Sequence, residues 1–526
     1  MSRVWSGGTI GYLLAAATLV ALAPVPTASV PSFLPASPPS EDEGGVHPFG
    51  LNVVSGRRDG LALQDVRVSG GFRPGELVNC HLQNEASIVA YGDRVYVAYN
   101  DTRKCNDDLG LPGVRRSENG FARSTDGGRT FEDLGPIVSG SGPVEHLSGD
   151  PTLAVDTRGE DAGTVYYSSL AGGFVGGTAE LIWEGVGVGV SRDGGGEFEW
   201  YPASGPDASR DKPWIAVDNS GGPYDGNVYV TWAHTGDPRS IRIVRSEDAG
   251  RTWSAPISLD PGDWTNGARP IVGPDGAVHV VWLRHAGFTE LHAARSTDGG
   301  RTFSAPETVA RFPDITDSGA CPGYTSVNGK IRVYEMPSVA VDSHGSPDPA
   351  SPDYNPDRGR LYVTWPAKGV QSGDATDVWL TSRDPSTGAW STRLRVNDDQ
   401  TDSDQLFPEV VVPGPGHVLV SWTDRRDDPA NLMLRQYAAE SGDGGASFGP
   451  SGPVSDLAFP PPYTFPNSDP FIAPCYAGDY NGLYAGEDGT VYAAWGDQRD
   501  DLVIQGPAGQ RTIPDPNVYF RSFTGA

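Results

Sequence analysis

A short motif of the form S-x-D-x-G-x-x-[FW] recurs along the chain and limits what the chain can fold into. Five copies have this spacing and a sixth is one residue longer; they begin at Ser124, Ser191, Ser246, Ser296, Ser441 and, for the longer copy, Ser382. Between copies lies a second unit, an apolar stretch, a glycine turn and a run such as VYVTW, as in residues 215–232. Short strands bounded by turn residues and repeated every ~40–60 residues are typical of a β-propeller.

Each repeat predicts four strands, A to D, with the octad at the turn between C and D. Long helices are disfavoured, because the chain has 69 Gly, 46 Pro and only 3 Met. We therefore predict an all-β, seven-bladed propeller of four-stranded antiparallel blades, with a six-bladed ring as the alternative. The seven A/B pairs are expected to begin near Ile88, Leu153, Ile215, Ile271, Val339, Val410 and Leu483.

The seventh repeat is incomplete, because its third strand, NVYFRS (517–522), is followed by only four residues. A closed ring must take the missing strand from elsewhere. The alternating segment LALQDVRVS (61–69), just before the first repeat, is available. We predict that it supplies strand D of the last blade, because closure removes an exposed sheet edge.

The N-terminus predicts export. Residues 1–28 hold Arg3 and an apolar run from Gly11 to Ala23, which suits a signal peptide and is shorter than the ~20 apolar residues of a membrane span. Residues 29–48 are rich in Pro and Ser and predict a disordered tether, and 49–526 a single propeller domain. We expect a secreted monomer without a membrane partner. A net charge of −28 disfavours nucleic acid.

Four cysteines in an exported chain predict two disulfides, for which three pairings are possible. Cys80 and Cys105 flank the first A/B pair, whereas Cys321 and Cys475 fall in the loops that precede later A strands. These positions put all four on one face of the ring. We predict the pairs Cys80–Cys105 and Cys321–Cys475.

The octads resemble the Asp-boxes, or BNR repeats, of the sialidase superfamily. In the octads themselves, the Ser and Asp side chains are expected to bond backbone N–H groups of a tight turn, a structural role. The resemblance implies a glycoside hydrolase acting on exposed glycans, and in a sialidase the chemistry uses an arginine triad for the substrate carboxylate, a tyrosine nucleophile activated by a glutamate, and an aspartic acid as proton donor.

Strand direction alternates in such blades, so the loops before strand A and after strand B share one face, where we expect the site. We assign Tyr480 as nucleophile, Glu335 as its partner and Asp150 or Asp479 as the acid, from loop position alone. The expected carboxylate clamp is Arg269, Arg425 and Arg499. Other charged positions on this face are Glu85, Lys212, Asp101 with Arg103, and Asp497, next to Arg499.

Several alternatives stay open. The Asp-x-Arg pairs 101/103 and 497/499 are as well explained by latches between neighbouring blades. The chain could be a non-catalytic carbohydrate-binding or scaffold propeller. It could also be a seven-bladed polysaccharide hydrolase that uses two carboxylates, for instance Asp150 and Glu335, with aromatic subsites from Trp214, Trp264 or Tyr324.

No cofactor is required by these readings. The acidic loop NDDQTDSDQ (397–405) offers Asp398, Asp402 and Asp404 as oxygen ligands for Ca²⁺. A solvated acidic turn explains the same residues more simply.

Overall fold

The structure is a computed structural model in which the chain separates into two units, residues 1–46 and 47–526. It describes residues 64–70, 82–103, 116–137, 144–174, 181–461, 475–506 and 509–524 of the second unit. The predicted signal peptide and tether, and the predicted Cys80–Cys105 pair, lie outside the described residues. Within those ranges there is no helix, and hence none that could span a membrane.

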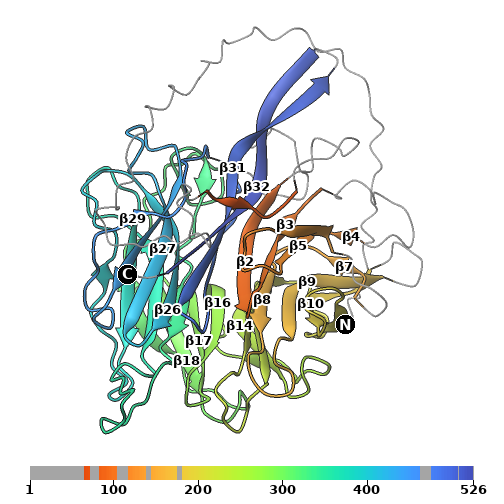
Figure 1. The fold of residues 1–526 in the computed structure, drawn as a ribbon, viewed down its shortest axis with the longest axis vertical. Coiled ribbons are helices and arrows are strands. Elements are labelled where there is room, and N and C mark those ends of the chain that lie inside the picture. The colour runs from red at the N-terminus through yellow and green to blue at the C-terminus, as the bar shows by residue number, and fades with distance from the viewer. Residues whose placement is uncertain are drawn as a thin grey trace, which may run out of the picture. The chain divides into compact units, whose positions relative to one another are not determined.

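The described strands form seven antiparallel blades arranged around a ring (Figure 1). Blade 1 is β2 (Gln83–Tyr91), β3 (Arg94–Asp101), β5 (Asn119–Ser124) and β6 (Glu132–Pro136). Blade 2 is β8 (Thr152–Val155), β9 (Val165–Phe174), β10 (Leu181–Ser191) and β11 (Glu199–Pro202). Blade 3 is β12 (Arg210–Val217), β13 (Val228–His234), β14 (Ser240–Ser246) and β15 (Ile257–Ser258).

The remaining blades follow the same order. Blade 4 is β16 (Trp264–Val272), β17 (Val278–His285), β18 (Thr289–Ser296) and β19 (Glu307–Phe312). Blade 5 is β22 (Ser338–Val341), β23 (Leu361–Ala367), β24 (Asp377–Arg383) and β25 (Leu394–Arg395). Blade 6 is β26 (Gln405–Gly414), β27 (His417–Asp424), β28 (Arg435–Ser441) and β29 (Gly452–Pro453). Blade 7 is β30 (Gly482–Ala485), β31 (Thr490–Gly506), β32 (Gly509–Thr524) and β1 (Val66–Arg67).

The innermost strands close the ring, because each contacts the next and β30 contacts β2. Each begins where the sequence predicts an A strand, so the seven-bladed prediction is confirmed and the six-bladed alternative is wrong. Small additional strands lie at the loop ends: β4 (Arg116–Ser117) and β7 (His146–Leu147) extend blade 2, and β20 (Ser326–Val327) pairs with β21 (Ile331–Arg332).

The N-terminal segment completes the last blade as predicted. β1 pairs antiparallel with β32, with Val66 opposite Phe520 and Arg67 opposite Tyr519. Val68 extends the pairing through its N–H, which donates to the Val518 carbonyl at 2.8 Å. The third strand of blade 7 therefore has no free edge at this end, and the two ends of the propeller domain are held in one sheet.

The core lies between blades. Five tryptophans near the ends of second strands are fully buried: Trp232, Trp282, Trp365, Trp422 and Trp495. Burying a tryptophan leaves its indole N–H in need of an acceptor. In blades 3 and 4 this is a carboxylate from the segment just before the first strand of the same blade, Asp207 for Trp232 at 2.9 Å and Asp260 for Trp282 at 3.0 Å.

The octads form the turns between third and fourth strands, as predicted, and all six copies lie there. In the fourth blade, Ser296 Oγ donates to Asp298 (2.8 Å) and accepts the Gly300 N–H (2.9 Å), while Asp298 accepts the Thr302 N–H (2.9 Å). Gly300 has a φ of +75°, and an added Cβ would lie 2.8 Å from the ring of Tyr229. The repeated spacing of Ser, Asp and Gly in the octads is thus explained by the geometry of the turn and by the close approach of the glycine to the neighbouring blade.

The predicted disulfide Cys321–Cys475 is confirmed, with a Cα–Cα distance of 6.2 Å. It joins the segment before β22, in blade 5, to the segment before β30, in blade 7. Blade 6 lies between these two segments in the sequence. Blade 7 also has longer strands than the other blades. The part of β31 after Asp497 pairs with the part of β32 before Asn517, and together they form a two-stranded ribbon that projects from the ring (Figure 1).

Candidate active site

The first strands of several blades begin with the same irregularity. The pairing of β2 with β3 shifts between Asn84 and Ser87, and that of β12 with β13 between Asp211 and Trp214. Each shift leaves two residues opposite one, which is a β-bulge, and a bulge redirects a side chain. Equivalent shifts occur in blades 4 and 6.

The first residue of this irregularity has a positive φ, which L residues with a side chain rarely adopt. In blade 4 it is Gly267, as expected for such a backbone. In blades 1, 3 and 6 it is instead Glu85 (51°), Lys212 (50°) and Phe407 (50°), and Asp150 (54°), just before β8 of blade 2, has the same conformation. Strain of this kind costs about 1–3 kcal/mol per residue and gathers at functional sites.

These three side chains, with Asp479 from the segment before β30, meet in what we call the lysine cluster. Lys212 Nζ lies 2.8 Å from Glu85, 3.0 Å from Asp150 and 2.8 Å from Asp479. The Asp479 N–H also donates to Glu85 at 2.9 Å. One buried ammonium therefore joins carboxylates from blades 1, 2 and 7, and the cluster lies where the first strands begin.

The environment of the cluster separates the protonation states of its members. Burial raises the pKa of Glu85 to about 7, although Lys212 opposes the shift. Burial acts in the same direction on Asp479, but Lys212 and Arg332 outweigh it and lower the pKa of that carboxyl. Burial alone would lower the pKa of Lys212, yet the three carboxylates raise it well above its ordinary value. Near neutral pH, Lys212 and Asp479 are charged and Glu85 is poised to exchange a proton.

Polar and aromatic neighbours surround the cluster. Asn100 donates to Glu85 at 3.0 Å and to the hydroxyl of Tyr476 at 3.2 Å. Arg332 binds Asp479 through two nitrogens, Nε at 3.1 Å and an NH2 group at 2.6 Å. Its guanidinium carbon lies 4.2 Å from the ring centre of Tyr476. Arg332 and Lys212 thus share Oδ2 of Asp479, and Tyr476 packs against the guanidinium of Arg332.

Two predicted acids, Asp150 and Asp479, are brought together, and the predicted nucleophile Tyr480 lies beside them. The Tyr480 hydroxyl donates to the Pro151 carbonyl at 3.0 Å, and its ring packs against Trp214. Burial and the nearby carboxylates of Glu85 and Asp150 raise the pKa of Tyr480 well above its ordinary value. The hydroxyl is therefore bonded to the main chain and protonated.

Glu335, the predicted partner of Tyr480, is placed differently. Its carboxylate accepts the Ile315 N–H at 2.9 Å, and burial raises its pKa. Neither Tyr480 nor any member of the lysine cluster bonds to it among the described residues. The position before an A strand was insufficient to predict this, because the segment leading to β22 is long and folds on itself.

The three arginines of the predicted clamp are held by three different sets of carboxylates. Arg269 makes a two-point pair with Glu409, with both distances 2.6 Å, and its guanidinium lies 3.7 Å from the ring centre of Trp214. Arg425 is fully buried and bonds Asp404 at 3.1 Å. They share no partner with Arg499, so the structure does not assemble the clamp from these residues, and their substrate-binding role stays a prediction.

Arg499 belongs instead to a second group, the closure cluster, made of Asp65, Asp456, Arg499 and Arg521. Arg499 lies 2.9 Å from Asp65 and 2.5 Å from Asp456, and Arg521 lies 2.7 Å from Asp65. Asp65 and Asp456 also accept each other's backbone N–H, at 2.9 and 3.0 Å.

The closure cluster joins four segments: the residue before β1, the segment after β29, and the second and third strands of blade 7. The 497/499 pair thus makes the contacts expected of a latch between neighbouring blades. The 101/103 pair is similar, because Arg103 binds Asp101 and Asp133 and also donates to the Gly70 carbonyl at 3.0 Å, beyond β1.

The central channel contains a cavity of about 700 Å³. Its walls are the first strands of the blades, and Trp214, Arg269 and Glu409 line it. Trp214 packs against Tyr480 with ring centres 4.9 Å apart, so these two rings lie between the channel and the lysine cluster.

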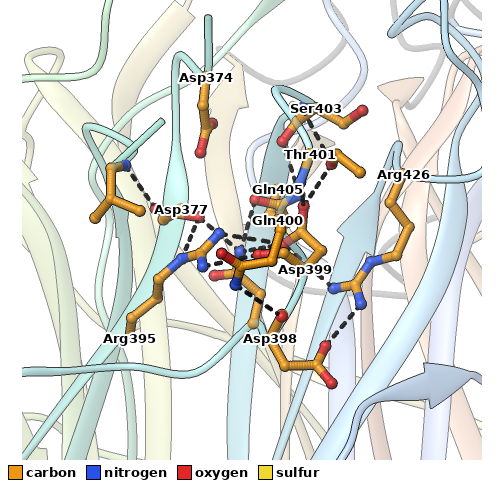
Figure 2. Close-up of polar contacts among 12 residues, drawn as sticks. Asp374, Asp377, Arg395, Asp398, Asp399, Gln400, Thr401, Ser403, Gln405 and Arg426 are labelled. Carbon is orange, nitrogen blue, oxygen red and sulfur yellow. Dashed lines mark hydrogen bonds and ion pairs between the residues drawn. The ribbon is translucent and has the colours of Figure 1, made fainter. Parts of the chain in front are cut away.

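The acidic loop 397–405 is held by arginines (Figure 2). Asp398 pairs with Arg426 at 2.8 Å, and Asp404 pairs with Arg425 at 3.1 Å. Asp402 is exposed. Within the described ranges no group of three or more His, Cys, Asp or Glu is arranged to hold a metal ion, and the calcium site stays a prediction.

Four members of the site had no assigned role from sequence. Glu85 and Lys212 occupy predicted loop positions, but nothing in the sequence indicates that their backbone has a positive φ. Arg332 and Tyr476 lie in long segments without strand periodicity. Their one sequence signal is the neighbouring cysteine, since Tyr476 follows Cys475, which fixes its segment to the one that carries Arg332.

No family model matches the sequence, and no curated protein matches it. Solved structures similar to the chain include an ulvan lyase described as a new family of polysaccharide lyase, at 13% identity and a TM-score of 0.47, covering 88% of this chain and 97% of that one. A Hadza microbial sialidase has 14% identity and a TM-score of 0.38, covering 91% and 98%. A Penicillium chrysogenum α-L-arabinanase complexed with arabinobiose has 11% identity and a TM-score of 0.41, covering 68% and 93%. At this level of similarity no residue role passes from those proteins to this chain.

Proposed function

We propose that this chain is a glycoside hydrolase that uses the carboxylates of the lysine cluster. The observation that carries the proposal is the meeting of Glu85, Asp150 and Asp479, from three separate blades, on one buried lysine. Glu85, Asp150 and Lys212 have a strained backbone with positive φ. Hydrolysis of a glycosidic bond needs one carboxyl that gives a proton and a second, ionised one that acts as base or nucleophile.

Glu85 and Asp150 are the pair best suited to these two roles. Each lies within 3.0 Å of Lys212 Nζ, so their bonded oxygens are at most about 6 Å apart. This limit allows the ~5–5.5 Å spacing of retaining glycosidases and is below the ~6.5–9.5 Å spacing of inverting ones. Glu85 has the raised pKa, about 7, that a general acid requires. Asp150 has 10% of its side chain exposed and is the carboxylate that meets the substrate.

The sialidase interpretation has weaker support. It needs three arginines around one substrate carboxylate, whereas Arg269, Arg425 and Arg499 are each paired elsewhere. It also needs an activated tyrosine, whereas the Tyr480 hydroxyl donates to a main-chain carbonyl. We therefore favour a two-carboxylate hydrolase over an exo-sialidase. Export to an oxidising compartment is part of the proposal and is supported by the Cys321–Cys475 disulfide.

The test is release of reducing ends from a panel of neutral and acidic polysaccharides, beside a fluorogenic sialoside. We expect turnover of a polysaccharide that falls at least 100-fold in Glu85→Gln and Asp150→Asn, and a rate that falls as pH rises through about 7 as Glu85 loses its proton. Tyr480→Phe should retain activity on that substrate. Sialoside turnover that is lost in Tyr480→Phe would replace this proposal with the sialidase one, and binding without turnover on the whole panel would replace it with a carbohydrate-binding propeller.

A further inference from the structure

A row of aromatic side chains leads away from the lysine cluster along the loop face. Arg332 begins it, with its guanidinium carbon 4.2 Å from the ring centre of Tyr476 and 5.7 Å from that of Tyr334. Tyr334 is followed by Trp264, with ring centres 6.5 Å apart, and Trp264 by His285 at 4.7 Å. We call Tyr476, Arg332, Tyr334, Trp264 and His285 the aromatic row.

The outer part of the row lies at the edge of the core between blades. The tryptophans of the second strands, such as Trp232 and Trp282, are fully buried, whereas Trp264, Tyr334 and His285 are partly exposed. Trp264 packs against the core between blades 4 and 5 with part of its surface, and Tyr476, next to the cluster, is buried. Trp264 is the first residue of β16 and pairs with His285, the last residue of β17. Both therefore lie at the loop end of blade 4, the end at which the lysine cluster also lies.

Two fixed links connect the row to the cluster. Arg332 holds Asp479 through two hydrogen bonds, and Asp479 in turn binds Lys212 at 2.8 Å. The Cys321–Cys475 disulfide ties the segment of Arg332 and Tyr334 to the segment of Tyr476. Rings held in this way lose little freedom when a ligand packs on them, which favours binding.

The chemistry of the row selects a neutral ligand. The C–H faces of sugar rings pack on aromatic faces, and several rings in succession suit several successive sugar units. The one arginine in the row is already paired with Asp479, so it is not an open anion site. Burial lowers the pKa of His285, which leaves its imidazole uncharged near neutral pH.

We propose that the aromatic row is a set of subsites for an extended, uncharged polysaccharide chain that runs from the lysine cluster toward blade 4. This inference rests on the proposed function and names its substrate class. It predicts that affinity increases with the length of the oligosaccharide, because the sugar units furthest from the cluster pack on Trp264 and His285.

The test compares Trp264→Ala with Trp253→Ala. Trp253 is also partly exposed, but it belongs to an octad turn, where its indole donates to the Gly250 carbonyl. Binding of arabinan, xylan, laminarin and starch, with hyaluronan as the anionic counterpart, is measured by affinity electrophoresis in the wild-type and the Asp150→Asn backgrounds. Melting temperatures establish that each variant is folded.

We expect at least one neutral polysaccharide to bind, with a loss of at least tenfold in Trp264→Ala, little loss in Trp253→Ala, and little effect of either on binding of its disaccharide. Equal affinities in the two variants, or binding of hyaluronan alone, would overturn the inference. Binding that depends on Trp264 without any hydrolysis would uphold the row and refute the hydrolase. Hydrolysis that depends on Glu85 but not on Trp264 would support the hydrolase and refute the aromatic row as a set of subsites.

Discussion

The lysine cluster and the closure cluster each bury a carboxyl group whose pKa is about 7, yet they differ in nearly everything else. In the lysine cluster, burial raises the pKa of Glu85 against the attraction of Lys212. In the closure cluster, burial and a hydrogen bond with Asp456 raise the pKa of Asp65 against two arginines. A perturbed pKa alone therefore does not distinguish a functional site from a structural latch.

What separates the two clusters is backbone strain and the residues beside them. Glu85, Asp150 and Lys212 have positive φ, whereas none of Asp65, Asp456, Arg499 and Arg521 does. Exposure does not separate them, because Asp150 and Arg332 have 10% and 11% of their side chains exposed, and Asp456 and Arg499 have 23% and 10%. The lysine cluster lies next to an aromatic row, whereas the closure cluster holds the residue before β1 against the segment after β29 through reciprocal bonds from backbone N–H to carboxylate. We infer that the first cluster is built for a ligand and the second for closing the ring.

The largest expected effect is on the closure cluster. Deleting residues 50–70 removes both β1 and Asp65, which leaves the edge of β32 unpaired and takes one carboxylate partner from each of Arg499 and Arg521. We expect a loss of more than about 4 kcal/mol in the free energy of unfolding, or no folded protein. Denaturant unfolding measures it, with deletion of the predicted tether, 29–48, as the control. An unchanged melting temperature in the 50–70 deletion would refute closure by this strand.

Within the lysine cluster, Lys212→Met should destabilise the protein by roughly 3–5 kcal/mol, because it leaves buried carboxylates without their cation. Lys368→Met, at an exposed position, is the matched control and should change stability by less than about 0.5 kcal/mol. The free energies of unfolding are compared in urea at pH 7. If the two substitutions lower the free energy of unfolding by the same amount, the lysine cluster does not hold the blades together as its distances indicate.

The pH dependence of stability tests the closure cluster more finely. The folded pKa of Asp65 is about 7, above its ordinary 3.8, so its stabilising contribution is complete below about pH 4 and is lost as pH rises through 7. Asp65→Asn cannot ionise and should flatten the fall in stability between pH 4 and 8 by roughly 1–3 kcal/mol. Asp402→Asn, at an exposed carboxylate, should leave the profile unchanged. A wild-type stability that rises over this range would contradict the assignment.

The smallest effect is expected from combining substitutions in the two clusters. Glu85→Gln and Asp65→Asn alter groups that share no side-chain partner, so their effects on the free energy of unfolding should add to within about 0.5 kcal/mol. Urea unfolding of the two single variants and the double variant at pH 6 measures the coupling. A coupling above 1 kcal/mol would mean that the two clusters form one network.

Much of the fold could be predicted because its signals are local and repeated. The octad spacing marks six turns, the VYV-x-W runs mark second strands, and the absence of a fourth strand after Ser522 implies closure by residues 61–69. The Cys321–Cys475 pair followed from loop positions on that framework. The site was predicted less well: Asp150 and Asp479, the alternatives for the acid, meet on Lys212, but Glu335 and the three arginines are not brought to them.

The sequence by itself determined the ring, because each blade is specified by residues within one repeat and by the alternation of side chains along its strands. The tertiary structure decided which charges meet. Lys212 binds Glu85 and Asp479, which are 127 and 267 residues away, and their approach depends on how blades pack around the channel and on bulges that turn individual side chains inward. No local pattern encodes that approach. A charged residue at a loop position has the same sequence context whether it joins a catalytic cluster, links two blades or pairs with a neighbouring residue.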